Sequence, residues 1–325
     1  MAHLKSLQRK AFYVAALVAC IITIVFLGWG VLRSVSGEGF ETVTTTSEAV
    51  APFPKKIWSY WDGKMSGLVK TCVKTWSKFN PDYEIVILNR ANLAQYLPDE
   101  DLSVKPWEGY DYTPQRFSDM VRLHILCKEG GVWMDATIIL QESLEWVQDI
   151  RRETGCEFFG YYLEKFSNDK WRDASPVLES WFFACTPGCK FVREWRDEFR
   201  TIVNYTTIWD YVNEARETTD LQNIMHPDYL AIHVSAQKLL QRESAAEKGG
   251  KKEEYGMVLM RAEDVPYAYL RDNKWNSMDA MKALVRGTYA DKALIKLRGP
   301  DRPAMEANKN MERYFSRLLS DKKTL

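Results

Sequence analysis

One acidic residue stands alone in an apolar segment in the middle of the sequence. Asp135 is the only charged residue between Glu129 and Glu142, and it follows the pair Gly130-Gly131. A buried carboxylate is costly unless it is paired or binds a cation. A divalent metal with oxygen ligands is a natural partner for it, and glycines let the backbone approach a bulky ligand. Asp135 is therefore the first candidate for a metal site.

Asp119 and Arg122 form a second candidate group upstream of it. They are three residues apart in a segment predicted to be helical, so they share one face of that helix. An acid and a base placed in this way could bind sugar hydroxyls together. A surface ion pair, which contributes little to stability, is the alternative interpretation.

The elements around these residues predict an α/β domain. Apolar and aromatic runs at 55–61 and 83–88 predict strands, and apolar positions at helical spacing over 67–79 predict a helix between them. This order favours a sheet with right-handed crossovers. A further helix is predicted over 117–128, followed by a buried strand over 132–140 that one Asp interrupts.

The N-terminal part of the chain predicts a membrane anchor. Residues 11–32 contain no charge, and about 20 apolar residues span a hydrocarbon core of roughly 30 Å. Cationic residues within 1–10 place that tail in the cytoplasm. Residues 33–51 are small and polar and predict a stem, and 52–325 predict one catalytic domain. We expect a single-pass type II membrane protein of the Golgi, with its catalytic domain in the lumen.

Charge and cysteine content narrow the possible functions. Lys+Arg and Asp+Glu are both 44, so the net charge of zero gives no reason to expect nucleic acid as a partner. There are 6 cysteines, and their spacing forms no zinc motif. Cys185 and Cys189 could form a disulfide in an oxidising compartment or remain buried thiols, and the sequence leaves both open.

The central motif resembles a known family. The pattern Ser118-Asp119-x-x-Arg122, followed by Gly-Gly-x-Trp-x-Asp135-Ala-Thr137, is similar to the motif of the capsular polysaccharide synthesis and glycosyltransferase family 32 group. Weaker similarity extends from Pro54 to Leu240. The resemblance implies a GT-A fold, a Rossmann-like mixed sheet flanked by helices. It also implies a nucleotide-sugar donor and a glycan or polysaccharide acceptor.

The resemblance further implies roles for individual residues. Asp135 corresponds to the first carboxylate of the family's D-x-D metal motif, and Thr137 stands where strict members have the second. The implied cofactor is Mn²⁺ or Mg²⁺. A third ligand from the C-terminal half would be His226 or His233, of which we choose His233, and a structural histidine is the alternative for each. The implied catalytic residues are Asp119, Arg122 and Asp135, and the implied donor-binding residues are Trp61, Asp119, Arg122 and Ser180. The positive charge of Lys296, near the C-terminus, makes it a candidate for binding the diphosphate of the donor. Arg298 and Arg302 are further candidates for binding the diphosphate.

Two other functions are compatible with parts of this pattern. A non-catalytic sugar-binding or scaffold protein on a decayed glycosyltransferase fold would explain the missing second Asp. A glycoside hydrolase needs two facing carboxylates, for which Glu179 and Asp135 are available, but no motif supports that pairing.

Overall fold

The computed structural model describes residues 50–100, 102, 114–246 and 255–320. The predicted tail, the predicted membrane helix and nearly all of the predicted stem fall within residues 1–49, outside the described part. Among the residues that are described, no helix combines the length and the apolar character needed to span a membrane. Residues 49–325 group into one unit.

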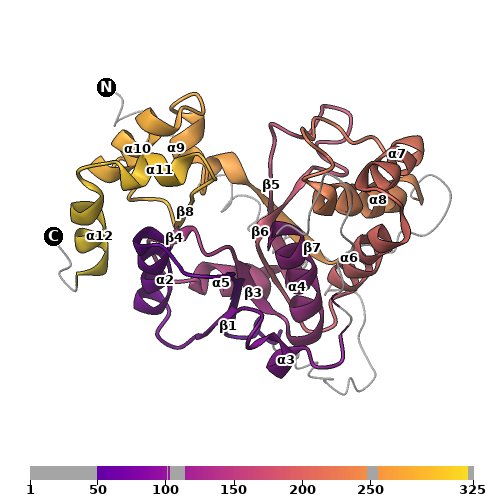
Figure 1. Ribbon diagram of the computed structural model, residues 1–325, viewed down its shortest axis with the longest axis horizontal. Helices are drawn as coiled ribbons and strands as arrows, with labels where there is room; N and C mark the ends of the chain where they lie inside the picture. Colours follow the sequence, from indigo (N-terminus) through magenta and orange to yellow (C-terminus); the bar gives the residue numbers. More distant parts are fainter. Residues whose placement is uncertain (1–49, 101, 103–113, 247–254, 321–325) are drawn as a thin grey trace, which may run out of the picture. The chain divides into compact units, whose positions relative to one another are not determined.

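A mixed sheet of six strands forms the centre of this unit (Figure 1). The strand order is β2-β1-β3-β6-β5-β7. β1 is parallel to β2 and β3, and β5 is parallel to β7, whereas β6 runs antiparallel to β3 and β5. The strands are β1 (Lys56–Tyr60), β2 (Glu84–Leu88), β3 (Gly131–Met134), β5 (Phe158–Tyr162), β6 (Leu178–Cys185) and β7 (Met257–Arg261). This sheet and its helices confirm the predicted α/β class.

A small antiparallel sheet lies beside the large one. β4 (Ile138–Leu140) pairs with β8 (Leu294–Lys296), and Ile138 lies opposite Lys296. The helices that follow the chain from start to end are α2 (Gly67–Phe79), α3 (Leu93–Tyr96), α4 (Pro114–Glu129), α5 (Glu145–Thr154), α6 (Lys190–Arg200), α7 (Ile208–Thr218), α8 (Ala231–Ala246), α9 (Ala268–Arg271), α10 (Ser277–Arg286), α11 (Asp301–Glu306) and α12 (Met311–Leu319), with 3-10 turns η1 (Thr201–Asn204) and η2 (Ala262–Asp264).

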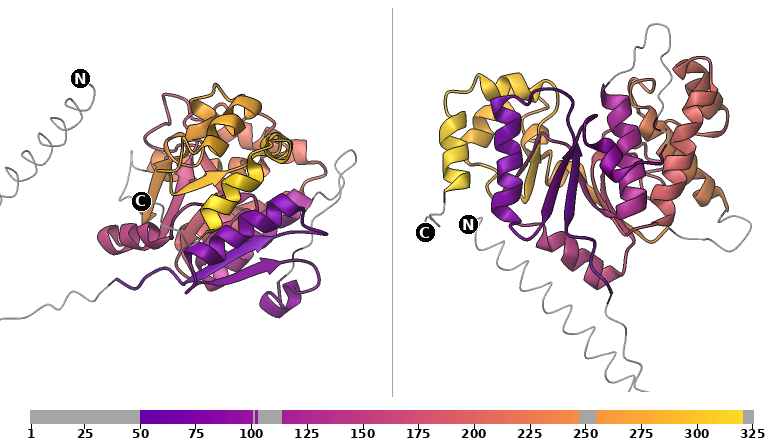
Figure 2. Two further views of the ribbon diagram at one scale, coloured as in Figure 1. Left: turned by 90° about the vertical axis from the view of Figure 1, so that its left-hand side faces the viewer. Right: turned by 60° about the horizontal axis from the view of Figure 1, so that its bottom comes forward.

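Both faces of the large sheet are buried by helices. Ile57 and Phe182 pack into a core with α2, α5 and α9–α12, whereas their neighbours Trp58 and Phe183 pack into a second core with α4 and α6–α8. Figures 1 and 2 show α2 beside α12 and α4 beside α6. Because side chains of a strand alternate between two buried faces, the strands are continuous apolar runs in the sequence.

The strand predicted over 132–140 is wrong in one respect, because the chain turns in its middle. β3 ends at Met134 and β4 begins at Ile138, in a different sheet. The backbone N–H of Asp135 donates to the Trp181 carbonyl (2.9 Å), and the Ile138 N–H donates back to the Asp135 carbonyl (3.0 Å). The turn takes the Asp135 side chain out of the apolar core, which a straight strand would not do.

The cysteine alternatives are resolved for the described part of the chain. Its five cysteines, Cys185 and Cys189 among them, are buried free thiols. Burial raises the pKa of Cys189 to about 11, which keeps that thiol protonated and unreactive at neutral pH.

Candidate active site

A cavity of about 590 Å³ opens at the edge of the sheet where β1 and β3 end and β6 begins. Carboxyl ends of parallel strands are the usual ligand-binding edge of open α/β sheets, and this volume is within the range of ligand sites. Every site residue that the sequence predicted lines the cavity: Trp61, Asp119, Arg122, Asp135, Thr137, Ser180, His233 and Lys296. The structure thus brings together residues from both ends of the described chain.

Asp135 lies between two cations in this cavity. Its Oδ2 accepts a hydrogen bond from the Lys296 ammonium (2.7 Å), and its Oδ1 accepts from Arg122 Nη2 (3.2 Å) and Trp133 Nε1 (3.2 Å). Burial alone would raise the pKa of Asp135, but the charges of Lys296 and Arg122 hold that pKa below its ordinary value. The carboxylate is therefore ionised and paired, with 29% of its side chain still exposed to the cavity.

The Asp119–Arg122 pair is part of the same network and is not a surface ion pair. The two side chains are 13% and 6% exposed, and Arg122 Nη1 lies 3.0 Å from Asp119 Oδ1. Arg122 also donates to Ser180 Oγ (2.5 Å) at the start of β6. One guanidinium on α4 thus links Asp119, Asp135 and Ser180, which fixes their positions relative to one another.

Thr137 uses its hydroxyl entirely within the protein. Its Oγ1 donates to the Leu297 carbonyl (3.0 Å) and accepts from the Lys296 ammonium (3.0 Å). The residue is 7% exposed. Thr137 therefore helps to hold Lys296.

His233, the predicted third metal ligand, lies beside Glu179. His233 lies on α8 in the same cavity, and its Nε2 is 3.5 Å from Glu179 Oε2. Within the described ranges, no group of three or more His, Cys, Asp or Glu is placed to hold a metal ion. A divalent cation needs several free oxygen ligands, whereas Asp135 already pairs with two cations, and Asp119 and Glu179 face Arg122 and His233. The donor set around Asp135 does not fit the predicted Mn²⁺ or Mg²⁺.

A buried carboxylate positions the C-terminal side of the cavity. Asp301 is 0% exposed and accepts hydrogen bonds from the Arg298 backbone N–H (2.8 Å), Arg298 Nε (2.9 Å) and Ser277 (2.6 Å), and the Tyr269 hydroxyl lies 3.0 Å from its Oδ2. Arg298 and Arg302 both line the cavity. Asp301 thus fixes the turn that carries them, and no ion pair engages Arg302 within the described residues.

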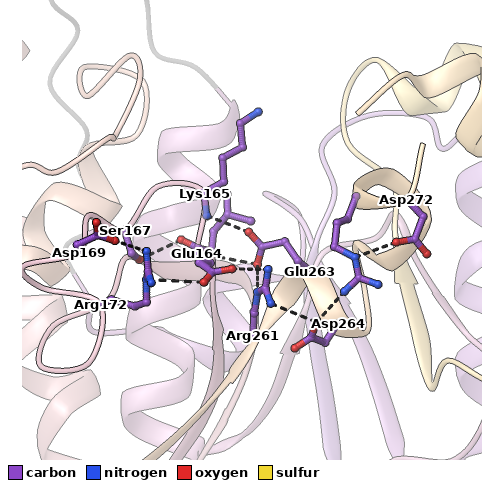
Figure 3. Close-up of polar contacts among 11 residues, drawn as sticks. Glu164, Lys165, Ser167, Asp169, Arg172, Arg261, Glu263, Asp264 and Asp272 are labelled. Carbon is purple, nitrogen blue, oxygen red and sulfur yellow. Dashed lines mark hydrogen bonds and ion pairs between the residues drawn. The ribbon is translucent and has the colours of Figure 1, made fainter. Parts of the chain in front are cut away.

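An ionic network anchors another wall of the cavity (Figure 3). Glu263 is 3% exposed. Its carboxylate accepts hydrogen bonds from the backbone N–H groups of Glu164 (3.2 Å) and Lys165 (3.0 Å). Arg261 pairs with Glu164 and lies 3.6 Å from Asp264. These contacts tie the loop after β5 to β7 and η2, and they leave the Lys165 side chain at the cavity wall.

Sequence reasoning did not identify three further residues at the cavity, which are Met225, Tyr229 and Trp275. Met225 and Tyr229 line it and are 56% and 55% exposed. Trp275 lines it as well, under the guanidinium of Arg298 at 5.2 Å. No spacing marks these residues in the sequence, because they lie in connections between helices and not in a periodic element.

Two glycosyltransferases are similar to part of this chain. O-glycosyltransferase braB of Annulohypoxylon truncatum is 24% identical over 164 residues, or 46% of this chain. Glycosyltransferase afumC of Aspergillus fumigatus is 26% identical over 163 residues, also 46% of this chain. The chain spans about two fifths of the length of these relatives, 37% and 40%.

The structural overlap with solved proteins is loose. Galactosyltransferase LgtC, solved with donor and acceptor sugar analogues, has 12% identity and a TM-score of 0.42, over 83% of this chain and 97% of its own. That overlap is too weak to assign individual residues. The family model described as capsular polysaccharide synthesis protein matches residues 32–213, more than half of the sequence. The chain therefore belongs to the capsular polysaccharide synthesis protein family.

Proposed function

We propose that this protein is a glycosyltransferase of the GT-A type, which moves a sugar from a nucleotide-sugar donor to a glycan or polysaccharide acceptor. The observation that carries the proposal is the buried network of Asp119, Arg122 and Asp135 in one cavity with Lys296. The names of two relatives, a glycosyltransferase and an O-glycosyltransferase, support the same function.

The cavity offers different chemistry to each part of such a donor. Trp61 follows β1 and lines the cavity, where its ring is available to stack on a base. The Asp119 carboxylate can accept hydrogen bonds from sugar hydroxyls, and Arg122 holds that carboxylate in place. Arg302 and Lys296 can donate to diphosphate oxygens.

The reaction that this arrangement supports is a displacement at the anomeric carbon. The bond between that carbon and the diphosphate oxygen breaks, and its electron pair stays on the diphosphate. The acceptor hydroxyl oxygen forms the new bond to the carbon and releases its proton to water. The protein contributes orientation of the sugar and positive charge beside the leaving group. No step is assigned to a metal, because the donor set does not fit one.

The proposal is tested with the purified full-length protein and a panel of nucleotide sugars, with and without manganese. We expect release of a nucleoside diphosphate from at least one donor. Trp61→Ala should weaken donor binding roughly tenfold with little change in melting temperature, because base stacking contributes about 1–3 kcal/mol. Trp209→Ala, on an exposed residue of α7, is the matched control and should change neither. Absence of turnover and of binding for every donor would favour the non-catalytic scaffold.

Asp119 gives the activity an acidic limb. Burial raises the pKa of Asp119 to about 6, although the charge of Arg122 lowers it. Because the ionised form holds the sugar and pairs with Arg122, kcat/KM should fall roughly tenfold per pH unit below pH 6. The unfolded pKa is about 3.9, so ionisation of Asp119 costs folding free energy. Its contribution to stability is present below about pH 4 and is lost as pH rises through 6.

A pH series of kcat/KM and of thermal melting measures both trends. Activity and the stability contribution of Asp119 should move in opposite directions between about pH 4 and 6. Asp119→Asn should have low activity with no limb near pH 6. An unchanged limb in that variant would assign the titration to another group.

The proposed location is the Golgi lumen, with the chain anchored as a type II membrane protein. This part of the proposal is supported by the uncharged segment 11–32 and its cationic flank. Asn204, in the sequon Asn-Tyr-Thr, is exposed and accessible to luminal glycosylation. Cleavage of residues 52–325 by protease added outside intact vesicles would contradict the luminal location.

A further inference from the structure

The Lys296 ammonium occupies the position next to Asp135 and Thr137 where a D-x-D motif would hold its metal. It lies 2.7 Å from Asp135 Oδ2 and 3.0 Å from Thr137 Oγ1, and its side chain is 9% exposed. These two oxygens come from the first and third residues of the motif. The positive charge at this point of the cavity therefore belongs to the protein itself.

The backbone holds Lys296 in this position. β8 pairs with β4, so Lys296 lies opposite Ile138, the residue after Thr137. The Leu297 N–H donates to the Thr137 carbonyl (3.2 Å), while the Thr137 hydroxyl donates to the Leu297 carbonyl (3.0 Å). Tyr269 donates to the Lys296 carbonyl (2.7 Å). These contacts fix the backbone of Lys296 beside Thr137, so its side chain starts next to the Asp135 carboxylate.

The motif as it stands here is suited to an ammonium and not to a divalent ion. Both oxygens of Asp135 already accept from cationic donors. A metal ion at this point would lie close to Lys296 and Arg122, whose positive charges already take up the carboxylates of Asp135 and Asp119. Replacing the second carboxylate by the neutral Thr137 removes the charge that a divalent ion requires but leaves a hydroxyl that an ammonium can use.

An ammonium carries three N–H donors, and the protein uses two of those of Lys296. The third is available to an oxygen in the cavity, which Arg302 also lines. We propose that Lys296 is a built-in cation that binds the diphosphate of the donor and stabilises it as leaving group, so that donor binding needs no divalent metal. This inference rests on the proposed function, because it takes the donor to be a nucleoside diphosphate sugar.

In the transfer step, Lys296 acts on the charge that develops. As the bond from the anomeric carbon to the diphosphate oxygen breaks, the electron pair adds negative charge to the diphosphate. The ammonium keeps its proton and donates a charge-assisted hydrogen bond to that oxygen. Asp135 and Thr137 are then positioning residues for Lys296, since they hold the ammonium without touching the sugar or the diphosphate.

The test measures binding of UDP, GDP, ADP and CDP to the purified full-length protein by calorimetry, in EDTA and in manganese. We expect at least one of them to bind equally well in both conditions. Lys296→Met and Lys296→Gln should each weaken that binding roughly 10- to 100-fold in EDTA, because a charge-assisted hydrogen bond is lost. Lys282→Met removes an exposed lysine of α10, paired with Asp279, and should leave binding unchanged.

The possible results test separately the role of Lys296, the need for a metal and the identity of the donor. Binding that survives Lys296→Met in EDTA overturns the role of Lys296. Binding that requires manganese overturns the built-in cation and leaves the proposed function standing. If none of the four diphosphates binds under either condition, the nucleotide-sugar donor itself is wrong. If both Lys296 variants unfold, the wild-type protein still shows whether nucleotide binding needs a metal. Binding is then compared in EDTA and in manganese, and a manganese titration followed by electron paramagnetic resonance measures whether the protein binds the ion.

Discussion

Asp135→Asn is expected to abolish sugar transfer and to lower the free energy of unfolding by about 3 kcal/mol. The substitution leaves Lys296, whose side chain is 9% exposed, without its charged partner. Removing one member of a buried ion pair costs about 3–5 kcal/mol, and the lower end applies because part of Asp135 faces the cavity. Denaturant unfolding and a transfer assay on the same preparation measure the two effects.

A double-mutant cycle separates the pairing from other effects of the substitution. Asp135→Asn combined with Lys296→Gln removes both charges, so most of the lost stability should return while activity stays absent. Asp291→Asn breaks an exposed pair with Lys292 and is the surface control, with no measurable change expected. A single variant that unfolds no more easily than wild type would show that Lys296 does not depend on Asp135.

Local patterns in the sequence were sufficient to predict much of the frame. The strands at 55–61 and 83–88 and the helix over 67–79 correspond to β1, β2 and α2. Each is an apolar run or a helical period that burial on the sheet explains. Candidate residues at strand ends were also predictable, because carboxyl ends of neighbouring parallel strands meet at one edge of a sheet.

The partners of Asp135 were not predictable in the same way. Lys296 lies 161 residues away in sequence and reaches Asp135 only because β8 pairs with β4. The sequence analysis predicted β3 and β4 as one strand over 132–140, because an apolar run does not reveal where the chain passes from one sheet to another. The metal assignment depended on the motif alone, and the choice between a metal and an ammonium depends on this long-range pairing.

The structure gives the Gly130-Gly131 pair a different role from the one that the sequence suggested. The sequence suggested that it lets a ligand approach the backbone. In the structure the pair makes the tight connection from α4 to β3, where both glycines have positive φ, +63° for Gly130 and +97° for Gly131. The close neighbours are protein atoms, among them the Lys56 carbonyl of β1.

Gly131→Ala is expected to destabilise the protein by about 4 kcal/mol, which is in the range of severe single substitutions. A methyl group at this position would lie 2.7 Å from the Lys56 carbonyl oxygen, and that backbone belongs to β1, which pairs with β2 on one side and β3 on the other. Strain at a φ of +97° adds to the clash. Denaturant unfolding measures the loss, and transfer activity should fall with it because β3 carries Asp135 at its end.

Gly188→Ala is the control that separates the clash from backbone strain. Gly188 also has positive φ, +69°, but a methyl group there meets no atom within 4 Å. Only the conformational cost of roughly 1–2 kcal/mol remains. The difference between the two variants therefore measures how tightly β1 and β3 pack at the start of the strand that ends in Asp135. Equal costs for the two substitutions would mean that β1 can move away, and the position of Asp135 would then not depend on this contact.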